Sequence, residues 1–141
     1  MRSSTGAQRM GLRLFHAVWG LPQNLVGALV ALVSVRSPHR VFRTALITEW
    51  PLDRGLSLGL FVFVPPGCQE RLIVHEYGHC VQSMVLGPLY LPVMVLPSMV
   101  WAGLPAFERL RRERGISYYD MPVEHWADVL GARVCAARSE G

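Results

Sequence analysis

The sequence predicts one domain of the α+β class, mainly helical, in which a small β-hairpin precedes two helices. Two stretches, 41–50 and 56–64, are rich in β-branched, aromatic and aliphatic residues, and the turn-forming residues 51–55 separate them. The helical stretch 69–87 ends at a Gly-Pro pair, and the stretch 122–137 begins with Pro. A chain of 141 residues is long enough for one hydrophobic core, so we expect a single domain over 1–141.

The composition favours a membrane protein over a nucleic-acid-binding one. Hydrophobic residues make up 51% of the chain, charged residues only 17%, and the mean hydropathy is positive. Several arginines between 109 and 114 are interleaved with Glu, which predicts a solvated helix face and also fits contact with anionic lipid head groups. No aromatic and basic platform accompanies them, so we expect no nucleic-acid partner. The three cysteines are widely spaced and predict no disulfide framework.

The N-terminal part predicts a mobile arm over 1–13 and a membrane helix over 14–35. Residues 14–35 carry no charge and are long enough to span a bilayer, which takes about 20 residues. Trp19 lies near one end, where aromatic residues meet the membrane interface. Pro22 and a few polar residues interrupt this apolar run. A secretory signal peptide and a buried helix of a soluble domain are the two other interpretations.

The predicted hairpin spans 41–64 and leads through Pro65-Pro66-Gly67 directly into the helix at 69–87. This order places a strand beside that helix. A strand in this position can bind an extended peptide by main-chain pairing, or it can simply cover one side of the helix.

A second apolar segment, 88–106, is broken by four prolines. A kinked membrane span, a re-entrant loop and a buried apolar connection all fit this pattern. The last predicted helix, 122–137, follows Asp120, which is a suitable N-terminal cap.

The motif that organises the chain is H-E-x-x-H at 75–79, within the helix at 69–87. His75 and His79 are four residues apart and therefore lie on one helix face, where both can bind one Zn²⁺. Glu76 points beside the metal, where it can accept a proton from a water and pass it to a leaving amine. Cys80 points away from this face and is expected in the core.

Two acidic residues on the last helix can complete the site. Glu124 and Asp128 are also four apart and share one face of an otherwise apolar helix. Glu124 can supply the third zinc ligand, and Asp128 can hydrogen-bond the far nitrogen of a ligand histidine. Taken alone, each has a simpler interpretation, Glu124 as a helix N-terminal acid and Asp128 as a surface charge.

These two motifs, H-E-Y-G-H and E-x-x-A-D-x-x-G, resemble those of the gluzincin zinc metallopeptidases. The integral-membrane branch with the CAAX prenyl endopeptidases and HtpX-type proteases is the most similar. The resemblance covers about 70–87 and 118–135, and it implies a minimal zincin-like core of hairpin, H-E-x-x-H helix and Glu-bearing helix. It implies zinc binding by His75, His79 and Glu124, with Glu76 as the general base and Asp128 orienting a histidine. The chain is far shorter than those enzymes, and 88–106 is too short for the membrane hairpin that they have between the motifs.

Both motifs must reach one ion, so 88–106 has to return the chain to the same side of the membrane. The Arg-rich stretch 109–114 is expected in the cytoplasm by the positive-inside rule. We therefore expect a protein of the bacterial inner membrane whose site faces the cytoplasm.

The expected reaction also needs a donor for the oxyanion that forms on the peptide carbonyl. Tyr118, Tyr119 and His125 are candidates, the tyrosines ranking above His125, and Tyr119 is the residue we predict. His16 and His39 have no partner at ligand spacing and are expected to be structural.

Three functions fit these residues. The first is a zinc-dependent metallopeptidase that hydrolyses peptide bonds with a metal-activated water. The second is a non-catalytic membrane or interaction protein with a structural zinc, although structural sites usually prefer Cys ligands. The third is a zinc amidase of other specificity. The first accounts for most of the motif residues and is our prediction.

Overall fold

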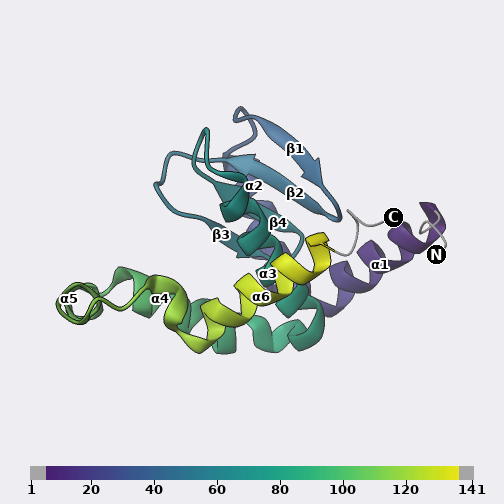
Figure 1. The fold of residues 1–141 in the computed structure, drawn as a ribbon. Helices are drawn as coiled ribbons and strands as arrows, with labels where there is room; N and C mark the ends of the chain where they lie inside the picture. Colours follow the sequence, from purple (N-terminus) through teal and green to yellow (C-terminus); the bar gives the residue numbers. More distant parts are fainter. Residues whose placement is uncertain (1–5, 137–141) are drawn as a thin grey trace.

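The computed structural model describes residues 6–136 and contains a four-stranded sheet with helices on both of its faces (Figure 1). The longer helices are α1 (Gly6–Trp19), α2 (Leu21–Val33), α3 (Glu70–Leu86), α4 (Leu96–Gly103), α5 (Pro105–Arg114) and α6 (Pro122–Ala136). The strands are β1 (His39–Phe42), β2 (Ala45–Glu49), β3 (Leu56–Leu58) and β4 (Phe61–Val64). Short helical segments are η1 (Gly87–Leu89), the π-helical η2 (Leu91–Val95) and η3 (Tyr118–Asp120). The mainly helical α+β class is confirmed.

The N-terminal segment differs from the prediction, because a break at Gly20 separates α1 from α2 and turns the chain by 99°. Residues 6–13 belong to α1 instead of a mobile arm, and residues 1–5 lie outside the described part. A continuous helix would bring the Pro22 ring against the carbonyl of the preceding turn. The side-chain amide of Asn24 donates to the carbonyl oxygen of His16 at 2.8 Å and so caps the end of α1. The polar residues that interrupt the apolar run therefore build the corner.

Within the described residues, no single helix is both long and apolar enough to cross a membrane. Two pairs of consecutive helices, each bent at a short break, meet these criteria of length and composition when the two helices of a pair are counted as one segment. They are α1 with α2, and residues 91–103 with α5, which are bent by 71°.

The predicted hairpin over 41–64 is wrong in its pairing. Each of its two predicted strands folds into a tight hairpin of its own, β1 with β2 and β3 with β4, and each turn has two residues. Arg43 and Gly59 begin these turns with φ values of 55° and 68°. β2 then pairs with β4 in parallel, which gives the order β1-β2-β4-β3 and leaves β3 at an edge.

The core lies between the sheet and α3. Alternate residues of β2 and β4, among them Ile47 and Val62, pack on Ile73, Tyr77 and Cys80 of α3. Cys80 is thus a core residue, as predicted. The neighbouring residues of the strands face α2, and Gly27 of α2 lies directly against the Phe61 side chain. α3 is therefore held between the sheet and α6, and the polar residues His75, Glu76 and His79 on it are buried.

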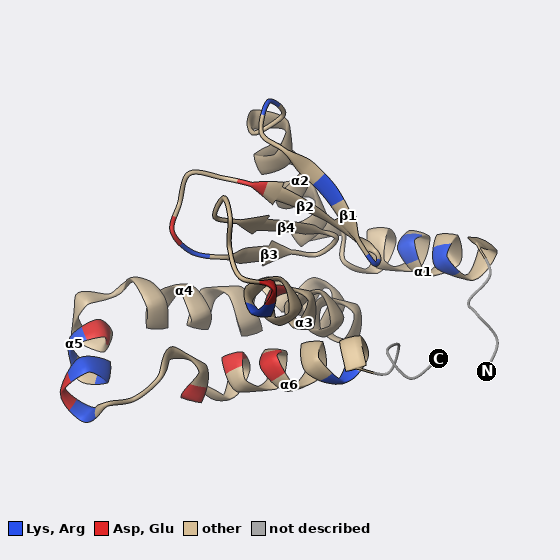
Figure 2. Ribbon diagram, turned by 45° about the horizontal axis from the view of Figure 1, so that its top comes forward, with Lys and Arg blue, Asp and Glu red and all other residues tan. Residues whose placement is uncertain are grey.

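The segment 88–106 is helical, in the form of η1, η2 and α4 with a turn into α5 at Leu104. Figure 2 shows charged residues on α1, α3, α5, α6 and the strands and loops of the sheet, while α4 carries none. The helix predicted at 69–87 is observed at Glu70–Leu86. The last predicted helix, 122–137, is observed at Pro122–Ala136, and residue 137 lies outside the described part.

Candidate metal centre

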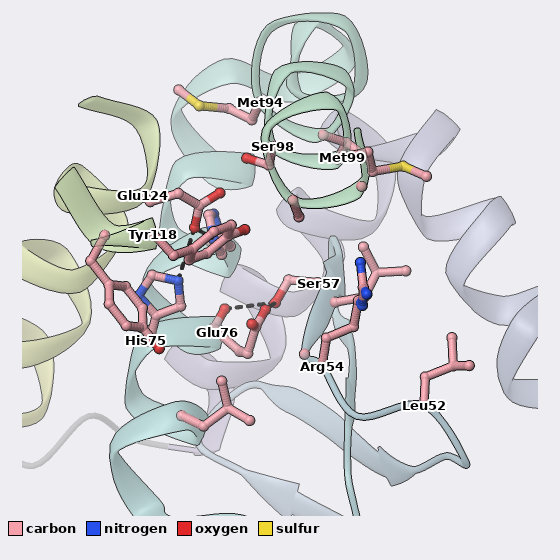
Figure 3. Close-up of a pocket in the computed structure, with 18 of the residues that line it drawn as sticks. Leu52, Arg54, Ser57, His75, Glu76, Met94, Ser98, Met99, Tyr118 and Glu124 are labelled. Atoms are coloured by element: carbon pink, nitrogen blue, oxygen red, sulfur yellow. Dashed lines mark hydrogen bonds and ion pairs between the residues drawn. The ribbon is translucent and has the colours of Figure 1, made fainter. Parts of the chain in front are cut away.

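The two histidines of the H-E-x-x-H motif and Glu124 of α6 meet at one point. The Oε2 atom of Glu124 lies 3.0 Å from Nε2 of His75 and 3.1 Å from Nε2 of His79 (Figure 3). One potential ligand atom from each residue lies within 4.8 Å of the others, and all three side chains are buried. Their predicted assembly into one group that can hold a metal ion is confirmed.

Small residues explain how α3 and α6 come close enough for this. A Cβ atom added to Gly78 would lie 1.8 Å from the carbonyl oxygen of Ala127, and one added to Gly131 would lie 2.1 Å from that of Val74. Glu124, Ala127 and Gly131 are the buried residues of α6 and lie on one face. The predicted E-x-x-A-D-x-x-G pattern is therefore a candidate metal ligand, Glu124, followed by two small residues, Ala127 and Gly131, that contact α3.

The far nitrogen of each histidine faces an oxygen acceptor. Gln82 Nε2 donates to the carbonyl oxygen of Val123 at 3.0 Å, so its Oε1 is left to accept from Nδ1 of His79 at 2.7 Å. Nδ1 of His75 lies 3.5 Å from Oδ1 of Asp128, which is longer than an ordinary hydrogen bond. As predicted, Asp128 faces the histidine nitrogen that points away from Glu124. Both rings are therefore oriented with Nδ1 toward these acceptors and Nε2 toward Glu124.

If neither Nε2 carried a proton, this orientation would bring three acceptor atoms together, which is unfavourable unless a proton or a metal cation lies between them. Burial lowers the pKa of His79, but hydrogen bonding to Glu124 and the charges of Glu76 and Glu124 outweigh burial, and the pKa is raised overall. Burial would raise the pKa of Glu124, but hydrogen bonds from His75 and His79 hold it well below its ordinary value. Oε1 of Glu124 is buried and has no hydrogen-bond partner among the described residues. A proton on the histidines or a bound metal ion can satisfy this group, and the two compete.

Glu76 lies next to His75, His79 and Glu124 but does not belong to the group that could hold a metal ion. Its Oε2 accepts a hydrogen bond of 2.7 Å from the Ser57 hydroxyl on β3 (Figure 3). Gly55 makes room for this carboxylate, since a Cβ atom there would lie 2.2 Å from Oε1 of Glu76. The edge of the sheet thus holds Glu76, the candidate general base, beside the ligand group of His75, His79 and Glu124. The contacts that hold Glu76 are separate from those that hold the ligand group.

A cavity of about 870 Å³ opens onto this group. Its polar end contains His75, Glu76, His79 and Glu124. Met94 and Met99 lie on its opposite wall, and Leu52 and Arg54 line the side next to the sheet (Figure 3). The cavity has room for several residues of an extended peptide.

The candidates for an oxyanion donor fall in different places. Tyr118 and Tyr119 both line the cavity, whereas His125 is exposed on α6 and does not line it. Burial and the negative charge of Glu124 raise the pKa of Tyr118, so its phenol keeps its proton. His16 and His39 lie away from the ligand group and make structural contacts, His16 with the Ser83 hydroxyl and His39 with the Thr48 hydroxyl.

Sequence reasoning places Gln82 near the cleft without a role of its own, and it does not identify Ser57 or Gly55. The role of Gln82 could have been found, because it lies three residues after His79 on the same helix face. Ser57 and Gly55 reach Glu76 through the pairing of β3 with β4, and no spacing along the chain reveals that contact.

Comparison of the chain with protein-family models, curated proteins and solved structures finds no match.

Proposed function

We propose that this protein is a zinc-dependent metallopeptidase. The observation that supports it best is the buried His75, His79 and Glu124 group with Glu76 beside it, at the end of a cavity large enough for a peptide. Two imidazole nitrogens and one carboxylate oxygen are the ligand set of catalytic zinc sites, in which a fourth position stays open for water. Zinc is preferred to Mg²⁺ or Ca²⁺ because those ions favour all-oxygen ligands.

Each residue has a role that follows from its position. When bound, Zn²⁺ supplies Lewis acidity, which polarises the peptide carbonyl and makes a water acidic enough to lose its proton near neutral pH. Glu76 accepts that proton while the water oxygen bonds to the carbonyl carbon, and it then gives the proton to the leaving amine. Ser57 holds the Glu76 carboxylate in place, and Gln82 and Asp128 orient the two imidazoles.

The proposed substrate lies along the cavity beside β3, which is an edge strand. The carbonyl oxygen of Ser57 already accepts a hydrogen bond of 3.0 Å from the Tyr90 hydroxyl, which makes it less available to a peptide. Gly55 precedes β3, lines the cavity and lies against Glu76, so its main chain is the nearest pairing site for an extended substrate.

We further propose that the enzyme works at a membrane, with its site on the cytoplasmic side of the bacterial inner membrane. Large hydrophobic side chains are exposed on α2, η2 and α4, including Leu25, Leu29, Leu96 and Met99. The Arg-rich α5 follows α4 directly, as basic segments on the cytoplasmic side of a bilayer do. A bent α1–α2 pair lying at or within the bilayer replaces the straight membrane helix in this proposal.

The proposal is tested with purified wild-type protein, Glu76→Gln, and the matched control Glu70→Gln at the exposed start of α3. We expect all three to bind one zinc ion per chain and only Glu76→Gln to lose cleavage of casein, by about 10²–10⁴-fold. Full activity of Glu76→Gln would remove Glu76 from the mechanism. Tight zinc binding without hydrolysis of any peptide by the wild type would favour a structural zinc instead.

A further inference from the structure

We infer that Tyr118, and not Tyr119, is the side chain that donates a hydrogen bond to the oxyanion formed on the substrate carbonyl. This inference rests on the proposed peptidase function and assigns a catalytic residue within it. The two tyrosines are adjacent in sequence and both line the cavity, so only their packing distinguishes them.

Tyr118 is held from three sides. It begins η3, whose N-terminus is capped by reciprocal hydrogen bonds between Ser117 and Asp120. The indole nitrogen of Trp101 on α4 donates to the carbonyl oxygen of Tyr118 at 3.1 Å, and the guanidinium of Arg111 lies 5.9 Å from the centre of the phenol ring. The backbone and ring of Tyr118 are thus fixed before any substrate arrives, which is what an electrostatic donor requires.

The Tyr118 phenol projects over the polar end of the cavity. In Figure 3 its ring lies beside the Glu124 carboxylate and on the cavity side of His75. Tyr118, Glu76 and Glu124 all line this one cavity. A peptide carbonyl placed between the ligand group and Glu76 therefore lies within reach of the Tyr118 hydroxyl.

Tyr119 packs differently. The centre of its ring lies 4.8 Å from that of His75 in an edge-to-face contact, and the guanidinium of Arg71 lies 5.2 Å from the centre of the Tyr119 ring. Its ring is thus held between an imidazole and a cation. We assign Tyr119 as a positioning residue that supports the His75 ring, through its aromatic surface and not through its hydroxyl.

As the water oxygen bonds to the carbonyl carbon, the carbonyl electron pair moves to oxygen and Glu76 takes the proton. The Tyr118 hydroxyl stabilises the new negative charge more than it stabilises the neutral carbonyl, so its loss affects the transition state more than substrate binding. Removal of one donor of this kind lowers kcat by about 10²–10³-fold.

The test compares Tyr118→Phe and Tyr119→Phe, each with its aromatic ring retained. The control is Tyr77→Phe, whose hydroxyl bonds to Thr44 on the sheet side of α3. Three quantities are measured on zinc-loaded protein: zinc affinity by chelator competition, kcat and KM for a peptide, and the Kd of a phosphinic peptide that mimics the tetrahedral anion.

We expect Tyr118→Phe to keep its zinc affinity and KM, to lose about 10²–10³-fold in kcat, and to bind the phosphinic peptide more weakly by a similar factor. The loss in Tyr119→Phe should be at least tenfold smaller. Equal affinity of wild type and Tyr118→Phe for the phosphinic peptide, or a larger loss in Tyr119→Phe, would overturn the assignment while leaving the peptidase intact. A zinc-loaded wild type that neither cleaves peptides nor binds the phosphinic peptide would overturn the proposed function, and this inference with it.

Discussion

Gly78→Ala should separate α3 from α6 and weaken metal binding without changing any ligand. The new Cβ atom would lie 1.8 Å from the Ala127 carbonyl oxygen, and real Cβ contacts are essentially never below 3.0 Å. Since 3.0 − 1.8 = 1.2, the two backbones must move apart by about 1.2 Å, whereas metal–ligand distances tolerate only about 0.2 Å. Glu124 lies one turn before Ala127 on the same face, so it moves with α6.

Two energies oppose each other in the stability of this variant. Alanine favours a helix over glycine by about 1 kcal/mol, and overpacking of a close contact costs about 1–3 kcal/mol. We therefore expect a net loss of up to about 2 kcal/mol in the free energy of unfolding of the metal-free protein, and a loss of zinc affinity of about 10–100-fold.

Zinc affinity is measured by chelator competition, and stability by denaturant unfolding of the metal-free protein. The matched control is Gly11→Ala in α1, where a Cβ atom meets nothing within 4 Å. That control should keep its zinc affinity and be no less stable than the wild type. If Gly78→Ala bound zinc as tightly as Gly11→Ala, the close approach of the helices would not be what brings Glu124 to the histidines.

Gly55→Ala should displace the Glu76 carboxylate, because its Cβ would lie 2.2 Å from Oε1; we expect cleavage to fall at least tenfold with unchanged zinc content, and loss of zinc would contradict this. Gln82→Ala removes the acceptor of the His79 Nδ1 proton, so zinc affinity should fall about 10–100-fold in a chelator titration, and unchanged affinity would refute that role. Burial lowers the pKa of His16 to about 4, so the unfolded chain binds its proton first as the pH falls. The contribution of neutral His16 to the free energy of unfolding is fully present above about pH 6.5. It declines as the pH falls toward 4, and the loss is about 2 kcal/mol at pH 5. In denaturant titrations His16→Gln should lack that part of the decline; identical pH profiles would exclude His16 as its source.

The ligand group could be predicted because its pattern is local. His75 and His79 are one helical turn apart, and Glu124 and Asp128 are as well, so each pair shares a face whatever the tertiary structure. The meeting of the two pairs was a chemical inference from zinc coordination. The small residues Gly78 and Gly131 then provide the physical means, since only short side chains let the two backbones approach to this distance.

The sheet and the N-terminal helices could not be predicted in the same way. Strand pairing depends on contacts between distant residues, and the tight turns at Arg43 and Gly59 redirect each predicted strand onto itself. At the N-terminus, average hydropathy favoured one long helix. The corner depends instead on individual side chains, with Pro22 breaking the helix and Asn24 bonding to both α1 and the backbone N–H of Leu60.

X-ray absorption at the zinc edge of the loaded protein tests the central claim most directly. We predict one zinc ion per chain, with two imidazole nitrogens and one carboxylate oxygen at about 2.0–2.2 Å and one further light atom from water. Glu124→Ala should lose a protein oxygen ligand while keeping both imidazoles. A wild-type spectrum with sulfur ligands, or with fewer than two imidazoles, would contradict a three-ligand site formed by His75, His79 and Glu124.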